Sequence, residues 1–385
     1  MIQIKNKNKT AYCKKAVVLA IILFAVSLVV NAQKLNPVLI QREARLSPFL
    51  KQELLSIRNV LASRNIKFQV GATEVFGRPV LSVTGALRTV INPVLFNSRL
   101  RKEYPKLVLK TPKSFSMRSD NLVTPIRFQG NCGSCWNFAI VACAEINYMM
   151  KYAKTDANAS SIDLSEQQIM CNANAGTCNG GASSAAAKWL YEKKIRILSE
   201  SSLSYNSVLP KLGNEAASCP QPQGTGIYTV VDFGMVPIQA GKDYPEANDI
   251  KKAILEHGAV TAAFWADSLV FAQFIQPFAS TEPYVVQEPI TPKDYTPKPF
   301  GHEVAIIGWD DDKQCWIIKN SWGDTWGDKG YGLFPYGAHN IGSDATWVEV
   351  EKIKTYSPIP VNINPNVNPV IIKPIPPPPI RRKNG

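Results

Sequence analysis

The sequence predicts a large folded unit that contains both helices and strands, on three grounds. The chain has 385 residues, of which 45% are hydrophobic, so it can bury a large core. The run from Cys135 to Met150 is apolar nearly all round, as expected of a helix inside a large domain. Leu255-Glu-His-Gly-Ala-Val260 has the pattern of a helix end running into a strand. One main folded unit with additional terminal segments suits this length better than several independent domains.

The most informative motif is Gln129-Gly-Asn-Cys-Gly-Ser-Cys135-Trp136. It places a thiol at the start of the predicted helix and an amide donor six positions earlier. The first helical turn directs unpaired N–H groups and a partial positive charge at Cys135, which favours thiolate over thiol. This is the arrangement of a cysteine nucleophile with an oxyanion donor. Cys132 and Cys135 also form a bare C-x-x-C, so a disulfide or half of a zinc site is the alternative.

The motif resembles the signature of the papain-like cysteine peptidases, in which His and Asn follow far downstream. Other segments resemble that family and stand in its order: Thr124-Pro-Ile-Arg-Phe-Gln129, Leu164-Ser-Glu-Gln-Gln-Ile-Met-Cys171, Cys178-Asn-Gly-Gly181, Gly301-His302-Glu-Val-Ala, and Asn320-Ser-Trp322-Gly. The resemblance implies an α+β fold of the papain-like, two-lobed kind, with the active site in the cleft between the lobes. The lobe from about Thr111 to Cys219 is expected to be helical, and the lobe from about Tyr228 to Lys354 is expected to be β-barrel-like.

The resemblance also implies a role for each catalytic residue. Cys135 attacks the peptide carbonyl, and the His302 imidazole holds it as a thiolate and later protonates the leaving amine. The Asn320 amide fixes the imidazole without adding charge, and Trp322 shields that hydrogen bond from water. The Gln129 amide and the Cys135 N–H stabilise the oxyanion. No metal or other cofactor is required.

The sequence contains three histidines, which allows the assignment to be checked by elimination. His257 stands at the predicted helix end, where a capping or surface role is favoured. His339 lies in a loop bracketed by glycines. His302 follows Cys135 by 167 residues, which is longer than the family's spacing of roughly 130 to 150. A Pro- and Tyr-rich insertion between residues 274 and 300 accounts for the difference.

Segments before the catalytic unit are interpreted as a signal peptide and a propeptide. Residues 1–32 combine a basic stretch, a short apolar stretch and small residues at a cleavage site, with an uncleaved anchor as the alternative. Residues 33–110 precede Thr111-Pro-Lys-Ser-Phe115, which resembles the family's mature N-terminus. Within them, Ser47 to Leu61 has helical spacing and residues 66–71 alternate like a strand. This segment is expected to be an inhibitory propeptide, with a separate basic binding module as the alternative.

The formal charge of +13 does not indicate a nucleic-acid partner. Residues 1–110 contain 19 Lys and Arg against 4 Asp and Glu, whereas residues 111–355 contain 20 against 26. The basic charge therefore belongs mainly to segments that would be removed. If charge helps to hold the propeptide on an acidic catalytic domain (111–355), self-processing should be faster near pH 4 to 5 than at pH 7.

The chain has eight cysteines, and an exported protein can form disulfides because the compartment outside the cytosol is oxidising. Cys13 would leave with the signal peptide, and Cys135 must stay free. By resemblance, two disulfides are expected, Cys132 with Cys178 and Cys171 with Cys219. Cys143 and Cys315 are expected to be buried free thiols, although spacing alone does not settle the pairing.

Residues 356–385 are rich in proline and are expected to form an extended polyproline II tail, acting as a spacer or docking arm. The protein is expected to be secreted, in an extracellular, periplasmic or lysosome-like compartment. It is expected to contact the membrane only through its signal peptide. Its expected partners are protein or peptide substrates and its own propeptide.

The resemblance implies substrate contacts at Gly181, which pairs with the substrate strand, and at Gly301, Phe300, Glu303 and Trp322. Phe300 and Glu303 flank the histidine and help to line the S2 pocket. Many relatives have Ala after the histidine, so Glu303 could favour Lys or Arg at P2, the second residue before the scissile bond. Alternatively, Glu303 turns to solvent or pairs locally.

Two other functions are weighed against a secreted peptidase made as a zymogen. A thiol-disulfide oxidoreductase using Cys132 and Cys135 would leave His302 and Asn320 unexplained. A catalytically silent binding protein of papain fold is disfavoured by the complete catalytic set. Cleavage of a peptide bond distinguishes the peptidase from both.

Overall fold

The structure is a computed structural model of the chain, and it describes residues 37–63, 70–78, 82–87, 111–207, 223–266 and 300–353. Residues up to Lys352 form one compact unit, and a second unit begins at Ile353. The predicted signal peptide, the Pro-rich tail and the insertion before Phe300 lie outside the described residues.

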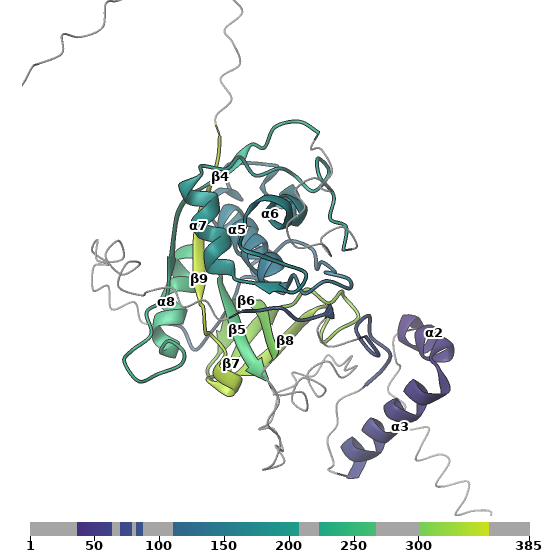
Figure 1. Cartoon of the computed structure of the whole chain (residues 1–385). Coiled ribbons are helices and arrows are strands. Elements are labelled where there is room, and N and C mark those ends of the chain that lie inside the picture. Colours follow the sequence, from purple (N-terminus) through teal and green to yellow (C-terminus); the bar gives the residue numbers. More distant parts are fainter. Residues whose placement is uncertain are drawn as a thin grey trace, which may run out of the picture. The chain divides into compact units, whose positions relative to one another are not determined.

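Most of the described helices lie in the first half of the chain and the longer strands in the second, with one helix among those strands (Figure 1). They are α2 (Pro37–Arg45), α3 (Pro48–Ser63), α5 (Cys135–Tyr152), α6 (Glu166–Asn172), α7 (Ser183–Glu192) and α8 (Ala247–His257). The strands are β1 (Ser114–Ser116), β2 (Gly176–Thr177), β3 (Gly180–Gly181), β4 (Tyr228–Met235), β5 (Val260–Ala266), β6 (Phe300–Asp310), β7 (Cys315–Lys319), β8 (Tyr331–Pro335) and β9 (Thr346–Lys352).

Local sequence explains where several helices begin and end. The Ser47 hydroxyl accepts a hydrogen bond from the Leu50 N–H at 3.3 Å, and Pro48 occupies the first position of α3. Ser165 caps α6 by accepting from the Gln168 N–H at 3.1 Å. Gly258 ends α8 with a φ of +90°, a conformation that an L side chain rarely adopts. The helix predicted over 47–61 is confirmed, whereas α2 was not predicted.

Antiparallel pairing around the long strand β6 builds the main sheet. β6 pairs with β1 and β5 at different parts of its length and with β7, and β7 pairs with β8. A register shift interrupts the β6–β7 pairing between Ile306 and Gly308, which bends the strand. β4 and β9 form a separate antiparallel pair.

Two hydrophobic cores correspond to the two predicted lobes. One core contains residues of α5, α6 and α7, and the other contains residues of β5 to β8 and α8. The lobes are not consecutive in sequence, however. β1 joins the sheet, while Tyr228 and Val350 of β4 and β9 pack in the helical core. The physical reason is that the β4–β9 pair covers its apolar face with α5 and α7.

The described residues of the 33–110 segment contribute to the sheet-side core. Leu54, Val70, Val75 and Val83 are almost fully buried and cluster with residues of that core. The two ion pairs among these described residues, Arg42 with Glu74 and Arg58 with Glu43, lie within the segment. Apolar packing therefore accounts for more of its described contacts with the sheet side than ion pairing does.

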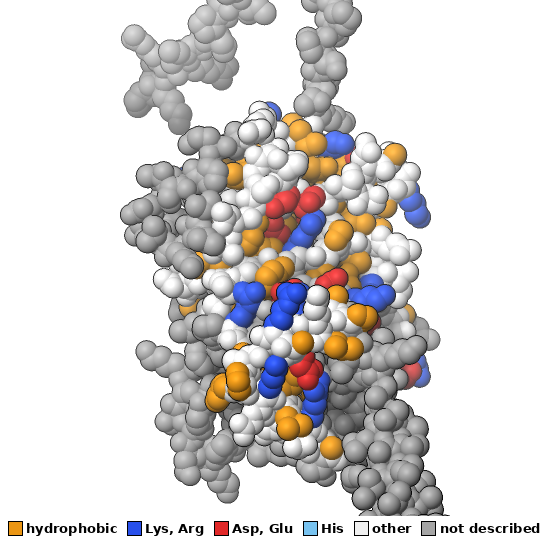
Figure 2. Space-filling view, turned by 90° about the vertical axis from the view of Figure 1, so that its right-hand side faces the viewer, with side chains coloured by type: hydrophobic (Ala, Val, Ile, Leu, Met, Phe, Trp, Pro, Cys, Tyr) orange, Lys and Arg blue, Asp and Glu red, His pale blue; other side chains and the backbone are white. Residues whose placement is uncertain are grey.

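Within the described residues, no helix has the length and apolar character needed to span a membrane. On the face shown in Figure 2, basic and acidic side chains are interspersed over the described surface. The positive formal charge of the whole chain is therefore not gathered into a patch on that face.

Candidate active site

Cys135 is the first residue of α5 and is fully buried. Ser134, the residue before the helix, makes no side-chain cap, and its carbonyl accepts from the N–H groups of Asn137 at 2.9 Å and Phe138 at 3.2 Å. Of this first helical turn, the Trp136 backbone makes a hydrogen bond that favours the ionised form of Cys135.

The cysteines of the C-x-x-C motif do not pair with each other. Cys132 forms a disulfide with Cys178 in the turn between β2 and β3, and Cys135 is a free thiol. The Gly133 N–H also donates to the Cys178 carbonyl at 2.9 Å. Cys171 is disulfide-bonded as well, and its expected partner Cys219 lies outside the described residues. Cys143 and Cys315 are buried free thiols.

His302 lies on β6 next to Asn320, which directly follows β7. Its Nε2 is 2.9 Å from the Asn320 Oδ1. The indole of Trp322 stacks on the imidazole with a centroid distance of 4.3 Å, and the ring of Phe264 meets it edge-on at 5.5 Å. These contacts fix the plane of the imidazole and exclude water from its bond to Asn320.

Gln129 is buried and is tied to the loop that follows Asn320. Its N–H donates to the Ser321 carbonyl at 3.0 Å, and its Oε1 accepts from the Ser321 hydroxyl at 2.7 Å. Its Nε2 donates to the Cys132 carbonyl at 2.8 Å. The side-chain amide is thereby held with its nitrogen towards the Cys132–Cys135 turn. Ser321 was not singled out in the sequence, although it lies within the Asn-Ser-Trp motif.

Residues 82–87 pass directly over Cys135. The N–H groups of Gly85 and Ala86 donate to the Gly301 carbonyl at 2.9 and 3.0 Å. Gly181 donates to the Gly85 carbonyl and accepts from the Leu87 N–H, both at 2.8 Å. Ala86 packs in a small apolar cluster with Cys135 and Ala263. The segment therefore occupies the backbone groups of the two glycines that were expected to bind substrate.

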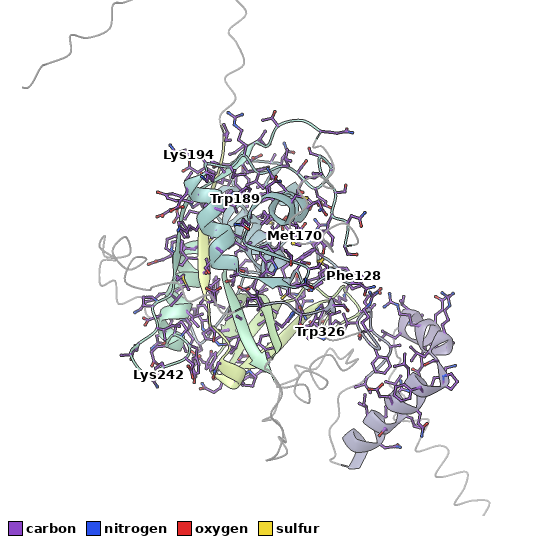
Figure 3. All side chains as sticks on the ribbon, in the orientation of Figure 1. Phe128, Met170, Trp189, Lys194, Lys242 and Trp326 are labelled. Carbon is purple, nitrogen blue, oxygen red and sulfur yellow. A yellow bond between two sulfur atoms is a disulfide. The ribbon has the colours of Figure 1, made fainter. Side chains whose placement is uncertain are left out.

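Close backbone packing holds this segment in place. A methyl group added at Gly85 would overlap the Gly133 carbonyl oxygen, and one added at Gly133 would overlap the Thr84 carbonyl oxygen. The Trp322 indole N–H donates to the Val83 carbonyl at 2.9 Å. Before this segment in the chain, the Arg78 guanidinium lies 5.0 Å from the ring centroid of Phe128, which is labelled in Figure 3. It also donates a hydrogen bond to the Asn131 side chain.

Burial under residues 82–87 suppresses the ionisation of the Cys135–His302 pair. Burial, followed by the nearby Glu303 carboxyl, raises the pKa of Cys135, against backbone hydrogen bonds at Glu303, Trp136 and Gly85. Burial also lowers the pKa of His302 to about 3, against the hydrogen bond that its ring donates to the Asn320 Oδ1. A neutral thiol and a neutral imidazole are therefore the stable forms in this closed arrangement.

Glu303 is buried together with Asp344 at the start of α7. Glu303 hydrogen-bonds with Ser183 and Thr261, and the Asp344 carboxylate accepts from the Ser184 hydroxyl at 3.1 Å. Ala182, at the N-cap of α7, offers no side-chain cap, so the carboxyls serve the exposed N–H end of the helix. Burial and the Asp344 carboxyl hold the pKa of Glu303 well above its usual range, and burial raises the pKa of Asp344 to about 7.

This placement bears on the alternatives for Glu303. Its side chain does not turn to solvent, and local hydrogen bonds are present. One carboxyl oxygen of Glu303 and one of Asp344 are buried without a hydrogen-bond partner among the described residues. A role for Glu303 in substrate binding stays a prediction.

Lys319, the residue before Asn320, is buried in a charged cluster. Its Nζ donates to the Thr124 hydroxyl at 3.2 Å, and that hydroxyl donates in turn to the Glu145 carboxylate. Burial lowers the pKa of Lys319, while the carboxylates of Glu145 and Glu166 oppose this shift. The cluster fixes the end of β7, and therefore the position of Asn320, against α5 and α6.

A profile of the family described as "Papain family cysteine protease" matches residues 111–348. The chain belongs to this family. "Cysteine proteinase 2" of Entamoeba histolytica is 29% identical over 287 residues, covering 71% of this chain and 81% of that protein. A cathepsin L-like peptidase of Aedes aegypti is 30% identical over 229 residues, covering 58% of each chain. The papain-family relationship makes the chain a cysteine peptidase by class.

Two solved precursors of papain-family enzymes share the fold. Digestive procathepsin L 3 of Tenebrio molitor larval midgut aligns with a TM-score of 0.55 and 18% identity, covering 83% of this chain and 96% of that one. A recombinant stem bromelain precursor aligns with a TM-score of 0.55 and 20% identity, covering 87% and 99%. The papain-like α+β fold predicted from the sequence is thereby confirmed.

The structure brings together most residues that the sequence singled out for the papain-family site. The substrate-side glycines Gly181 and Gly301 face residues 85–87, and Trp322 covers His302. The Phe300 side chain lies outside the described residues. Asp344 and Tyr205, which also reach this site, were missed because neither stands in a recognisable motif.

Proposed function

We propose that the chain is the precursor of a secreted papain-family peptidase that hydrolyses peptide bonds through an acyl-enzyme on Cys135. The observation that carries this proposal is the backbone pairing of residues 85–87 with Gly181 and Gly301 directly above Cys135. An extended chain already lies where a peptide substrate would have to bind. The alignment with two precursor structures also supports a zymogen.

In the open enzyme, the thiolate of Cys135 attacks the scissile carbonyl carbon, and the carbonyl oxygen becomes an oxyanion. The Cys135 N–H and the second N–H of the Gln129 amide stabilise that oxyanion. His302 donates its proton to the leaving amine as the C–N bond breaks, which leaves a thioester on Cys135. A water molecule, deprotonated by His302, then hydrolyses the thioester and restores the thiolate.

Asn320 supports His302 through the observed contact. When the Nε2–H donates to the Asn320 Oδ1, the lone pair is on Nδ1, and we assign this nitrogen to proton exchange with Cys135. Removal of residues 82–87 would readmit water and weaken the burial that keeps both groups neutral. The open pair could then become a thiolate and an imidazolium.

The proposed domain organisation follows the sequence. Residues 1–32 act as the signal peptide, 33–110 as the propeptide, 111–355 as the peptidase and 356–385 as the tail. Export to an extracellular, periplasmic or lysosome-like compartment agrees with two disulfide-bonded cysteine sites in the described chain. N-terminal sequencing of protein recovered from medium and from cells tests this organisation.

The decisive experiment uses residues 33–385 and a Cys135→Ser variant. After acidification, the chain should lose roughly its first eighty residues, cleave a fluorogenic peptide and bind an epoxide thiol probe at Cys135. The variant should do none of these. A stable chain that neither cleaves nor labels would instead support a silent binding protein, and oxidation of a Cys132–Cys135 pair would support the redox alternative.

We also propose that the enzyme prefers Lys or Arg at P2. Ala86 packs on Ala263, whose backbone pairs with Glu303 on one side and with Ser343 on the other. Glu303 is thus directly opposite Ala263, and Asp344 is the residue after Ser343. Each of the two carboxyls has one oxygen without a hydrogen-bond partner in the described chain. A cationic side chain entering in place of Ala86 would meet both.

Glu303→Gln and Asp344→Asn test this preference because each removes a carboxyl that could ionise beside a cationic P2 side chain and keeps a hydrogen-bonding side chain at the start of α7. Peptides with Arg or Leu at P2 should be compared by kcat/KM. The variants should lose about tenfold or more on the Arg peptide and change little on the Leu peptide. A native preference for Leu or Phe that Glu303→Ala leaves unchanged would discard the pocket hypothesis.

A further inference from the structure

Tyr205 links two parts of the site that come from different stretches of chain. Its hydroxyl donates to the Gln129 carbonyl at 2.9 Å and lies 2.7 Å from the Ser134 hydroxyl. Gln129 provides the side-chain amide of the candidate oxyanion site, and Ser134 directly precedes Cys135. One phenol therefore contacts both ends of the 129–134 turn, at the backbone carbonyl of Gln129 and at the side-chain hydroxyl of Ser134.

Counting protons fixes the direction of these bonds. A tyrosine hydroxyl has one hydrogen, and the Gln129 carbonyl can only accept, so that hydrogen goes to Gln129. The Ser134 hydroxyl then donates to the Tyr205 oxygen at 2.7 Å, since its other acceptor, the Cys132 carbonyl, lies farther away at 3.4 Å. Burial raises the pKa of Tyr205, so the phenol keeps its proton over the range in which a peptidase would work.

Tyr205 is itself held firmly in place. Its N–H donates to the Glu200 carboxylate at 2.7 Å, and the next residue, Asn206, donates its N–H to the Gln167 side chain at 2.8 Å. Its ring meets the Phe138 ring edge-on, with centroids 4.8 Å apart. Tyr205 is therefore anchored on α5 through the Phe138 ring and on α6 through the bond between Asn206 and Gln167.

The contacts of the turn explain why this anchoring matters. On its far side, Gln129 is bound to Ser321 in the loop after Asn320. Without Tyr205, the Gln129 backbone would be tied to the sheet side through Ser321 but would lose its bond to the helical side. The distance between the Gln129 amide and the Cys135 N–H depends on both attachments.

We propose that Tyr205 is a positioning residue that holds the Gln129 amide and the Cys135 N–H at the separation needed to bind one oxyanion. This proposal rests on the proposed roles of Gln129 and Cys135. Tyr205 acts through the turn and does not touch the substrate. Its loss should impair reactions that form an oxyanion and spare reactions that only need the thiolate.

Tyr205→Phe tests this in the mature enzyme obtained by processing of the full chain. The ring contact with Phe138 is kept and only the hydroxyl is removed. We expect kcat to fall about tenfold with KM changed less than about twofold. Inhibition by a peptide aldehyde, which forms a hemithioacetal oxyanion, should weaken by about the same factor. The rate of alkylation by iodoacetamide, which forms no oxyanion, should stay within about twofold.

Tyr148→Phe is the matched control. It also removes a phenol hydroxyl, one that donates to Asp156 at 2.7 Å on the far part of α5, and it should leave kcat and aldehyde inhibition unchanged. Equal loss of aldehyde binding and alkylation in Tyr205→Phe would overturn the proposal, since it would indicate a general defect at Cys135. Unchanged aldehyde binding would overturn it as well.

Gln129→Ala separates this proposal from the one on which it rests. If Gln129 supplies an oxyanion donor, Gln129→Ala alone weakens aldehyde binding, and adding Tyr205→Phe causes little further loss. If the double variant loses aldehyde affinity by the product of the two single-variant factors, Tyr205 does not act through Gln129 and the positioning role is refuted. If Gln129→Ala has no effect, the assigned role of Gln129 fails first.

Discussion

The N–H of Gly85 donates to the carbonyl of Gly301 at 2.9 Å, so a segment before the peptidase domain is bound to the residue next to His302. This contact places the main chain of residues 82–87 within the site, where side-chain substitutions alone would disturb it little. Inhibition by this segment should therefore depend on how closely two backbones can approach.

Gly85→Ala should weaken the closed form, because the added methyl group would overlap the Gly133 carbonyl oxygen. We expect a shorter lag before activity appears after acidification, and more residual activity at neutral pH. Progress curves with a fluorogenic peptide measure both. Leu87→Ala is the control, since its side chain is largely exposed and its N–H bond to Gly181 would remain. An unchanged lag in Gly85→Ala would contradict the steric account.

Acid should favour opening of the closed form through His302. Its pKa is lowered to about 3 by burial, whereas an exposed histidine titrates near 6.5. The open state therefore binds a proton first as the pH falls, and the closed form loses stability from about pH 6.5 down towards about 3. The charge argument from the sequence also predicts that the closed form loses stability as the pH falls, but it attributes the loss to carboxylates and not to His302.

The measurement for this prediction uses the Cys135→Ser chain, which cannot process itself. Stability against urea should decline between pH 6.5 and 4, and the decline should be smaller when His302→Gln is added. Equal pH dependence in both chains would assign the effect to other groups, such as carboxylates.

Lys319→Met should destabilise the fold by about 1 to 3 kcal/mol, because it removes the buried donor to the Thr124 hydroxyl and the cation near the Glu145 and Glu166 carboxyls, whose pKa values burial already raises. Urea unfolding of the Cys135→Ser chain at pH 7 gives the free energy. Lys188→Met is the matched control: Lys188 is half exposed and its partner Glu192 is 4.0 Å away, so a change under about 0.5 kcal/mol is expected. Similar losses in both variants would argue against the buried cluster.

Replacing Cys132 and Cys178 together by Ala should lower stability by roughly 2 to 5 kcal/mol. It should also lower activity, because the disulfide ties the Cys132–Cys135 turn to the β2–β3 turn. Melting temperature and kcat/KM measure the two effects. Cys315→Ala, at a buried free thiol far along the chain, should affect kcat/KM little. Full activity without the disulfide would show that the Gly133 bond to Cys178 is sufficient.

Local patterns in the sequence were sufficient for several parts of this protein. The apolar run after Cys135 predicts a buried helix, and Ser47-Pro48 predicts the start of α3, because both depend on residues within a few positions of each other. The order of the motifs was sufficient for the papain family and for an α+β fold.

Tertiary structure decided the features that join distant residues. Cys132 pairs with Cys178, which confirms the pairing implied by the family resemblance, whereas spacing alone could not distinguish it from a bond to Cys135. Glu303 is buried beside Asp344 because strand pairing around Ala263 brings both to the start of α7. Tyr205 reaches Gln129 across 76 residues of sequence. The chemical role of a single residue can be predicted from its local motif. Contacts between residues far apart in the sequence depend on the packing that buries the apolar faces of the two lobes together.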